Sequence, residues 1–538
     1  MPNSYALVLA TVCFLAITPF FWHGIPSGHD FEFHLFSWME VLGQWKQGIV
    51  YPRWAALAHW GYGEARFLFY PPASWTLGAA LGALLPWKLV PGAYCWIALT
   101  LAGAAMYRLA REWLAAPDAL FAAAFYAVNP YHLVIVYWRS AYAELLAAAL
   151  LPLLLLSLLR LKQPGVRPVL FLSLILAAAW LTNAPAAVMI HYSAAGLAVL
   201  VAARERSWRP LLRTALAVAL GAGLASFYLL PALYEEKWIN LGEVLALGVR
   251  PQDNFLFTTI ADVDHNRFNL LVSWVALAEI TIVVLAIWRS HAWRLKETLL
   301  WLLLSAWAGV TILLMFSISN PLWQYLPKFR FVQLPFRWLL CLNVALALLL
   351  TMATRRWRTR GLAAAALLAG LLLVGYRIQA PWWDSASDIQ EMRDAMADGT
   401  GNEGIDEYVP AGADPYELNK ALPRITDSGK TVPAQMIQWA PLEKRFIVHA
   451  SSPANLTLRL FNYPAWQVTV NGRLVTAETM EVTGQMLVPV AAGQSDVRIH
   501  FGRTLDRTIG DIVSLISLIL LLAVWIKMRP QNATSATT

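Results

Sequence analysis

Stretches of mostly apolar residues, each about 20 residues long, recur along this chain and limit its fold more than any other feature. Leucine and alanine dominate them, and a helix of that length crosses the hydrocarbon core of a bilayer. Of the 538 residues, 58% are hydrophobic and only 14% are charged. Soluble domains carry about 25% charged residues. The sequence therefore predicts a polytopic α-helical membrane protein.

We expect about twelve membrane-spanning helices, near residues 4–22, 92–110, 117–137, 142–161, 168–183, 185–203, 211–233, 270–288, 298–316, 335–353, 361–378 and 508–527. One further apolar segment, 73–89, is shorter and contains Pro86 and Lys88. We expect it to be re-entrant or interfacial, because it is short for a complete crossing.

The loops between the expected spans alternate in charge when 73–89 is left out of the count. Every second loop is basic, and basic loops face the cytoplasm. Both termini are therefore expected inside, and the long loops outside: 23–72, 234–269, 317–334 and 379–507. The net charge of +8 arises mainly in the short basic loops, so no nucleic-acid partner is expected.

The segment 379–507 changes its sequence pattern about halfway along. Its first part is polar, and from about residue 441 apolar residues alternate with a period of two, which is typical of strands. Asn471-Gly472 between "QVTV" and "RLV" predicts a tight hairpin. We expect an extracytoplasmic domain that is β-sandwich-like from about 441. A last transmembrane helix and a cytoplasmic tail should follow over 508–538.

Five segments together resemble a known family: "SGHDFEFHLF", "PRWAALAHWGYGEARFLFYPP", "VYWRSAYAELLAAALLPLLLL", "FYLLPALYEEKWI" and "FVQLPFRWL". They resemble bacterial membrane proteins described as 6-pyruvoyl-tetrahydropterin-synthase-related or YfhO-like. The tail "NYPAWQVTVNGRLV" is similar to the C-terminal module of the YfhO-like group. The pterin name implies no chemistry here, because the sequence lacks the zinc-type histidine cluster of a soluble pterin synthase.

That family is in turn similar to the GT-C glycosyltransferases. The resemblance implies a GT-C-like transmembrane domain over 1–378 in the bacterial cytoplasmic membrane. It also implies transfer of a sugar from a polyprenyl-phosphate donor to a glycan, lipid or protein acceptor on the extracytoplasmic face. GT-C enzymes keep an acidic residue early in the first outer loop, and Asp30 holds that position.

Asp30 and Glu144 are the catalytic candidates. Sugar transfer needs a general base for the acceptor hydroxyl, and Asp30 at the membrane boundary can serve as one. The alternative is that Asp30 only caps the following helix. Glu144 lies one turn inside a span, where a carboxylate is costly and therefore a functional hypothesis. Arg139 is its expected partner, and a structural ion pair is the alternative.

The leaving phosphate needs a fixed cation, and Arg337 in "FVQLPFRW" is the first candidate because arginine binds phosphate through two parallel hydrogen bonds. The alternative for such cations is contact with lipid headgroups. The further substrate-binding candidates are Arg139, Glu235, Glu236, Arg53, Arg66, Lys237 and Tyr70.

A divalent metal ion is an alternative role for His29 and His34 together with Asp30. His34 lies four residues after Asp30 and so on the same helix face. The sequence has no dense cluster of ligands of the kind that identifies a zinc site, so a divalent metal ion stays a candidate cofactor and none is assigned.

Two other functions stay open at this point. A glycolipid or polysaccharide transporter or flippase should show internal repeats and charges deep in several spans, and the sequence shows no obvious repeat. The second is a non-catalytic membrane protein of envelope assembly that keeps the fold without the chemistry.

Overall fold

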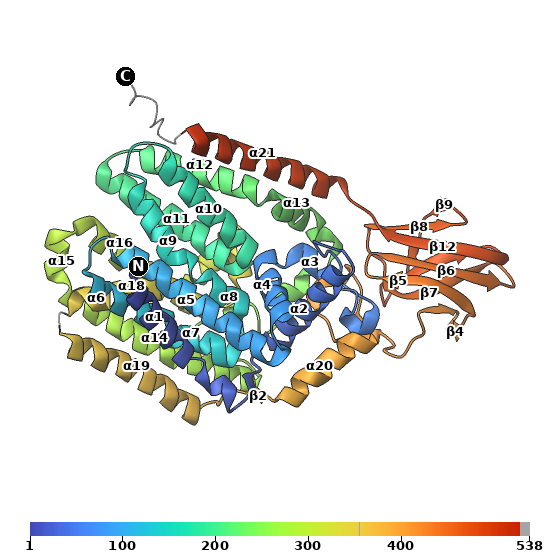
Figure 1. The fold of residues 1–538 in the computed structure, drawn as a ribbon, viewed down its shortest axis with the longest axis horizontal. Coiled ribbons are helices and arrows are strands. Elements are labelled where there is room, and N and C mark those ends of the chain that lie inside the picture. Colours follow the sequence, from blue (N-terminus) through green and yellow to red (C-terminus); the bar gives the residue numbers. More distant parts are fainter. Residues whose placement is uncertain (355, 528–538) are drawn as a thin grey trace, which may run out of the picture.

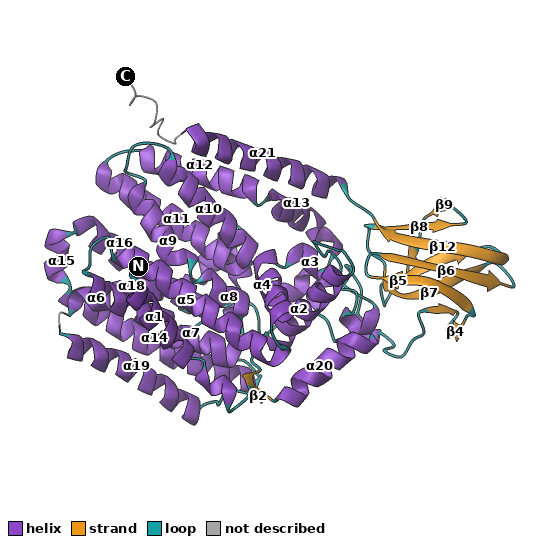
Figure 2. Ribbon diagram, viewed as in Figure 1, coloured by secondary structure: helices purple, strands orange, loops and turns teal. Residues whose placement is uncertain are grey.

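The structure is a computed structural model that describes residues 1–354 and 356–527. A large helical domain makes up most of the molecule, and a β-module extends from one end of it (Figures 1 and 2). The α-helices are α1 (Asn3–Leu15), α2 (Phe31–Lys46), α3 (Arg66–Phe69), α4 (Pro72–Leu84), α5 (Val90–Ala110), α6 (Ala116–Ala127), α7 (Pro130–Val134), α8 (Tyr142–Ala147), α9 (Leu150–Arg160), α10 (Arg167–Thr182), α11 (Ala184–Glu205), α12 (Arg209–Leu224), α13 (Ser226–Glu235), α14 (Val263–Arg289), α15 (His291–Lys296), α16 (Thr298–Leu314), α17 (Asn320–Tyr325), α18 (Leu339–Ala353), α19 (Trp357–Arg377), α20 (Ala386–Asp398) and α21 (Leu505–Lys527).

Within the described residues, eight helical stretches are long and apolar enough to cross a membrane. The number rises to ten if two bent pairs each count as one span: α12 with α13, bent by 79°, and α16 with α17 and its preceding turn, bent by 91°. The other two expected spans are the shorter helices α1 and α10, of 13 and 16 residues. The predicted polytopic fold is confirmed, whereas the count of about twelve is not.

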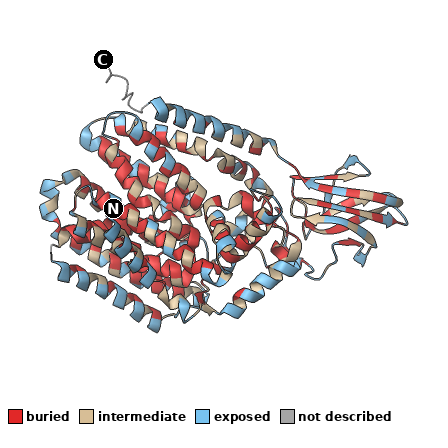
Figure 3. Ribbon diagram, viewed as in Figure 1, coloured by how far each residue is buried: buried red, intermediate tan, exposed pale blue. Residues whose placement is uncertain are grey.

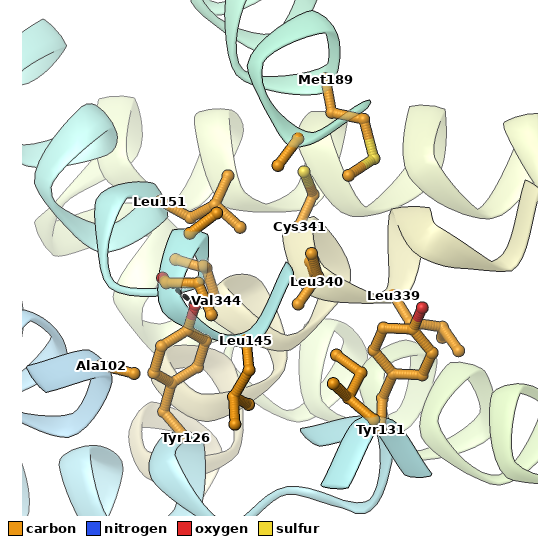
Figure 4. Packing of buried hydrophobic residues seen from close by; sticks show 14 of the residues in the cluster. Ala102, Tyr126, Tyr131, Leu145, Leu151, Met189, Leu339, Leu340, Cys341 and Val344 are labelled. Atoms are coloured by element: carbon orange, nitrogen blue, oxygen red, sulfur yellow. Dashed lines mark hydrogen bonds between the residues drawn. The ribbon is translucent and has the colours of Figure 1, made fainter. Parts of the chain in front are cut away.

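The centre of the helical domain is formed by the span Pro335–Ala353, of which 94% is buried inside the protein. Its side chains Leu340, Cys341 and Val344 lie among Tyr126, Leu145 and residues of neighbouring helices (Figure 4). By contrast, only 22% of α19 and 17% of α21 is buried. These two apolar helices lie at the periphery, where their exposed faces suit contact with lipid (Figure 3).

The ends of the helical domain differ in what they carry. α15, the start of α19 and the end of α21 lie at the end opposite to the β-module (Figure 1). These are ends at which the sequence places basic loops. The segment 73–89 forms most of α4, whose 13 residues contact α2 and α5, and ends in a turn at Trp87–Leu89 that leads into α5. Its re-entrant or interfacial character stays a prediction.

The β-module consists of two five-stranded antiparallel sheets, in the orders β10-β11-β7-β3-β4 and β5-β6-β12-β8-β9. Their bounds are β3 (Ile425–Asp427), β4 (Lys430–Thr431), β5 (Ala434–Ala440), β6 (Glu443–Ala450), β7 (Ala454–Phe461), β8 (Trp466–Val470), β9 (Arg473–Val475), β10 (Glu478–Thr479), β11 (Gln485–Val490) and β12 (Gly493–Phe501). Asn471 and Gly472 have φ angles of 51° and 76° in the turn between β8 and β9, as the predicted hairpin requires.

The contacts between the β-module and the helical domain include a shared hydrophobic core and a buried ion pair. One hydrophobic core joins Trp54, Tyr62 and Leu68 of the first long loop to the interior of both sheets. In the second contact, the buried carboxylate of Glu235 at the end of α13 is bound by Arg507 of α21 through two hydrogen bonds of 2.7 and 2.8 Å, and by the hydroxyl of Tyr463 at 2.6 Å. The predicted tail after α21 lies outside the described residues from position 528.

Candidate active site

The segment before α2 is fixed by hydrogen bonds to residues 139–140, which lie between α7 and α8. The hydroxyl of Ser140 accepts a hydrogen bond from the amide of Gly28 and donates one to the carbonyl of Pro26. The amide of Asp30 donates to the carbonyl of Arg139 over 2.9 Å. A methyl group on Gly28 would lie 2.4 Å from the carbonyl oxygen of Trp138, so only glycine permits this approach. Asp30 is thereby held next to Arg139.

The side chain of Asp30 has few direct partners. Asp30 occupies the N-cap position of α2, yet its carboxylate accepts no capping hydrogen bond. It forms no hydrogen bond or ion pair with any residue in the described part of the chain, although it interacts electrostatically with Arg139 and His34. Because the carboxylate is partly exposed and unengaged, it is available to a ligand.

Glu144, in contrast, is fully engaged. Its buried carboxylate accepts hydrogen bonds from Arg139 at 2.5 Å, from the hydroxyl of Tyr131 at 2.8 Å and from the Nε of Arg337 at 3.0 Å. The ion pair with Arg139 that the sequence indicates is therefore present. A carboxylate with three donors is a poor proton acceptor, so Glu144 fits a positioning role better than that of a base.

Arg337 lies between this carboxylate and the loop before α18. Its Nη1 donates to the carbonyl of Val332 and to the amide oxygen of Gln333. Arg337 and Arg139 together carry two positive charges, and the carboxylate that they share, that of Glu144, carries one negative charge. The group Glu144–Arg139–Arg337 has an excess positive charge, which suits an anionic ligand.

His34 and Tyr70 lie on the same side of α2 as Asp30. The Nε2 of His34 is 3.5 Å from the hydroxyl of Tyr70, and its ring contacts those of Trp38 and Tyr142. Burial lowers the pKa of His34 to about 4, against the opposing effect of Asp30. His34 is therefore a neutral imidazole near pH 7, and Tyr70 couples electrostatically to both Asp30 and Arg337.

The proposed metal site is not assembled. Among the described residues, no three His, Cys, Asp or Glu side chains lie close enough together to hold a metal ion. His29 instead contacts the rings of Phe268 and Trp382. The expectation that His29 and His34 join Asp30 around a divalent ion stays a prediction, and in this structure His34 turns toward a buried aromatic group.

Five of the weaker candidates lie in other contacts. Arg66 is buried, pairs with Glu64 and donates to the hydroxyl of Ser37 over 2.9 Å. Arg53 stacks on the ring of Tyr51. Glu235 binds Arg507 and Tyr463 as described above. Glu236 forms an ion pair with Lys328 at 2.8 Å, and Lys237 stacks on the ring of Tyr234. None of these contacts includes Asp30.

Two polar residues of the site have no obvious signal in the sequence. Tyr131 donates to Glu144, but a tyrosine in an apolar run reads as a core residue. Glu279 of α14 is fully buried and accepts from the amide of Tyr131 at 3.2 Å and from Asn343 at 2.9 Å. A lone glutamate within the run "VALAEITIVV" is the signal that could have indicated it.

An apolar groove of about 850 Å³ lies beside the site. Its walls come from α1, α6, α7 and α19, through residues such as Val12, Phe125, Leu133 and Leu368. The lining continues to Trp138, the residue before Arg139, and to Trp383, which pairs with Pro26 in a short sheet of β1 (Ile25–Pro26) and β2 (Trp383–Asp384). The groove thus reaches the two segments that place Asp30.

Three comparisons bear on the chain as a whole. The family described as "6-pyruvoyl-tetrahydropterin synthase related domain; membrane protein" matches residues 67–382. A comparison with curated proteins finds no match.

Among solved structures, the apo oligosaccharyltransferase of Archaeoglobus fulgidus is similar at 13% identity and a TM-score of 0.41, over 76% of this chain and 57% of that one. The oligosaccharyltransferase AglB from the same organism, in complex with an inhibitory peptide and a dolichol-phosphate, is similar at 13% identity and a TM-score of 0.40, over 75% and 56%. This chain spans little more than half the length of those chains.

Proposed function

The chain belongs to the 6-pyruvoyl-tetrahydropterin synthase related family of membrane proteins, and from this premise we propose that it is a membrane glycosyltransferase. It moves a sugar from a polyprenyl-phosphate-linked donor to an envelope acceptor. The observation that carries the proposal is the unengaged carboxylate of Asp30 beside the group Glu144–Arg139–Arg337.

The chemistry follows from these charges. The carboxylate of Asp30 takes the proton of an acceptor hydroxyl, whose oxygen then forms a bond to the anomeric carbon of the donor sugar. The bond between that carbon and the phosphate oxygen breaks, and the phosphate leaves with the electron pair. The excess positive charge of Arg139 and Arg337 stabilises the leaving phosphate. Glu144 holds both arginines in place through its hydrogen bonds.

The apolar groove supports a lipid-linked donor. Its walls are aliphatic and aromatic side chains of membrane helices, which suit a polyprenyl tail. Because the lining includes Trp138, a tail in the groove would bring its phosphate to the neighbourhood of Arg139. An ordinary membrane lipid is the competing occupant, and competition between polyprenyl phosphate and a phospholipid of the bilayer distinguishes the two.

The extracytoplasmic face of a bacterial cytoplasmic membrane is the proposed side of the reaction. Asp30 directly precedes α2, which lies on the β-module side of the helical domain, whereas α15, the start of α19 and the end of α21 lie at the opposite end (Figure 1). Basic ends face the cytoplasm in most membrane proteins, which supports this orientation.

The first prediction tests the base. Asp30→Asn keeps the size of the side chain and much of its capping capacity. Transfer from a radiolabelled polyprenyl-phosphate hexose, measured with purified protein in nanodiscs, should fall by about 10²–10⁴. The matched control is Asp264→Asn, because Asp264 is an exposed carboxylate in the first turn of α14 and pairs only with Arg267 among the described residues.

Retention of folding is checked by the melting temperature of both variants. Near-normal transfer by Asp30→Asn would mean that Asp30 only occupies the N-terminal end of α2, and it would contradict the proposed mechanism.

A further inference from the structure

A second, polar cavity lies apart from Asp30, where the helical domain meets the β-module. Its volume is about 300 Å³, at the lower end of the range of about 300–1,000 Å³ for ligand pockets. Four separate parts of the chain line it: α2, the loop after α2, the end of α20, and strands β5 to β7 with the residues before β3. A cavity assembled from four distant segments is well defined by the fold.

Two buried or half-buried polar atoms of this cavity lack partners. Gln44 is 1% exposed, and its amide nitrogen donates to the carbonyl of Trp54 at 2.8 Å, which fixes the orientation of the amide. Its Oε1 accepts no hydrogen bond from any described residue, and the Nε of Arg459 donates none. Unpaired buried polar atoms are costly. A hydroxyl group can serve both, since it donates and accepts.

The lining of the cavity has more basic than acidic residues. Arg424 stacks on the ring of Trp439 at 5.6 Å, and neither Arg424 nor Arg459 has a carboxylate partner among residues 1–354 and 356–527. The ammonium of Lys444 is buried and donates to the carbonyls of Ala440 and Pro441 at 2.9 and 2.8 Å. Against these three basic residues, Glu40 is the acidic residue of the lining.

We infer that this cavity binds an acidic sugar unit of a glycan. Sugar hydroxyl groups fit the unpaired atoms of Gln44 and Arg459, the flat ring of Trp439 offers an apolar face, and a carboxylate on the sugar balances Arg424 and Arg459. The carboxylate of Glu40 already accepts from the amides of Ala56 and Leu57, so it holds the loop that closes one side of the cavity.

This inference does not depend on the proposed transfer reaction, because it concerns binding at a separate place. The experiment is isothermal titration calorimetry of full-length protein in nanodiscs with a trigalacturonate probe, and with maltotriose as the neutral comparison. Trigalacturonate should bind, and maltotriose should bind at least about tenfold more weakly, as expected for the loss of a charged hydrogen bond. The Asp30→Asn protein should bind both probes as the wild type does.

Arg424→Gln is the informative variant, because Arg424 lies at the exposed rim and its replacement should not disturb folding. It should weaken trigalacturonate binding by about tenfold or more and leave maltotriose unaffected. Arg473→Gln, an exposed arginine of β9 away from the cavity, should change neither.

Three results would each overturn the inference: equal affinity for both probes, no binding of trigalacturonate, or equal effects of Arg424→Gln and Arg473→Gln. The cavity would then be a water-filled space between the two parts of the molecule. Gln44→Leu gives an independent check, since it removes the unpaired oxygen without a change of charge. It should weaken trigalacturonate binding, and unchanged affinity in that variant also contradicts the inference.

Discussion

Asp30 and Glu144 are two carboxylates in contrasting surroundings, and single residues set the difference. Glu144 accepts three hydrogen bonds from Tyr131, Arg139 and Arg337, whereas Asp30 accepts none from the described residues. A carboxylate stabilised by two guanidinium groups resists protonation. These contacts support the proposed roles of Asp30 as the base and of Glu144 as the residue that holds the two arginines.

The second prediction concerns Arg337. Arg337→Lys keeps the positive charge but loses the guanidinium group, whose Nε and Nη1 hold Glu144, Val332 and Gln333 while Nη2 is left for the phosphate. The affinity for radiolabelled polyprenyl phosphate in nanodiscs should fall by about tenfold or more. Arg330→Lys is the control, because Arg330 is exposed and stacks on Phe331 instead. Unchanged affinity in both Arg337→Lys and Arg337→Ala would exclude Arg337 from the donor site.

The third prediction uses two groups of the polar cavity that titrate near neutrality. Burial raises the pKa of Glu40 to about 7 and lowers the pKa of Lys444 to about 7. When the pH falls from about 8 to about 6, Glu40 loses its negative charge and Lys444 gains a positive one. Both changes make the cavity more positive, so the affinity for trigalacturonate should rise by roughly tenfold.

Other charges around this pair do not reverse the sign. The other basic residues of the lining are Arg424 and Arg459, and Arg66 and Glu64 form a buried ion pair near Glu40. Glu40→Gln should flatten the pH profile by removing one of the two titrations. An affinity of the wild-type protein that falls toward acidic pH is the result that this account does not allow.

Among the elements, the loop before α2 matters most, because it brings Asp30 to Arg139. The fourth prediction is that Gly28→Ala displaces this loop, since the added methyl group would overlap the carbonyl of Trp138. Overpacking of this kind costs about 1–3 kcal/mol. Transfer activity and the melting temperature should both fall. Gly196→Ala in α11, where no atom lies within 4 Å of the added group, should keep both.

The elements that the sequence predicts are those with local signals. Apolar runs predict the spans, and Asn471-Gly472 predicts the β8–β9 hairpin. The bend of 79° between α12 and α13 has no such signal. There the hydroxyl of Ser514 in α21 accepts from the amide of Phe227 and donates to the carbonyl of Gly223. Ser514, which lies 287 positions after Phe227, thus pairs with backbone groups at the break between the two helices. No local sequence pattern reveals such a partner.

The candidate site also contains residues that a local sequence signal predicts and residues that it does not. Spacing along one helix end predicts the pair of Arg139 and Glu144, and the loop position of Asp30 resembles that of a known family. The contribution of Arg337 to the same carboxylate, 193 residues away, depends on how α8 and the segment before α18 meet. Tyr131 joins the group for the same reason. Such contacts depend on tertiary packing, so composition and periodicity do not indicate them.

The whole molecule places its basic helix ends at one end and its β-module at the other (Figure 1). The fifth prediction follows from this polarity. A cysteine introduced at the exposed Thr476 of the β-module should react with an impermeant thiol reagent in intact cells, and one at the exposed Thr359 should not. The three native cysteines are buried and should give no background. Labelling at Thr359 alone would invert the proposed orientation.

The buried contact of Glu235 with Arg507 also dictates an order of assembly. Arg507 is synthesised 272 residues after Glu235, and the Tyr463 hydroxyl 228 residues after it. Until α21 emerges from the ribosome, the carboxylate at the end of α13 therefore lacks its cation. The contact can form only after both the β-module and this last helix have been synthesised. Completion of the joint between the helical domain and the β-module is thus a late event in biogenesis.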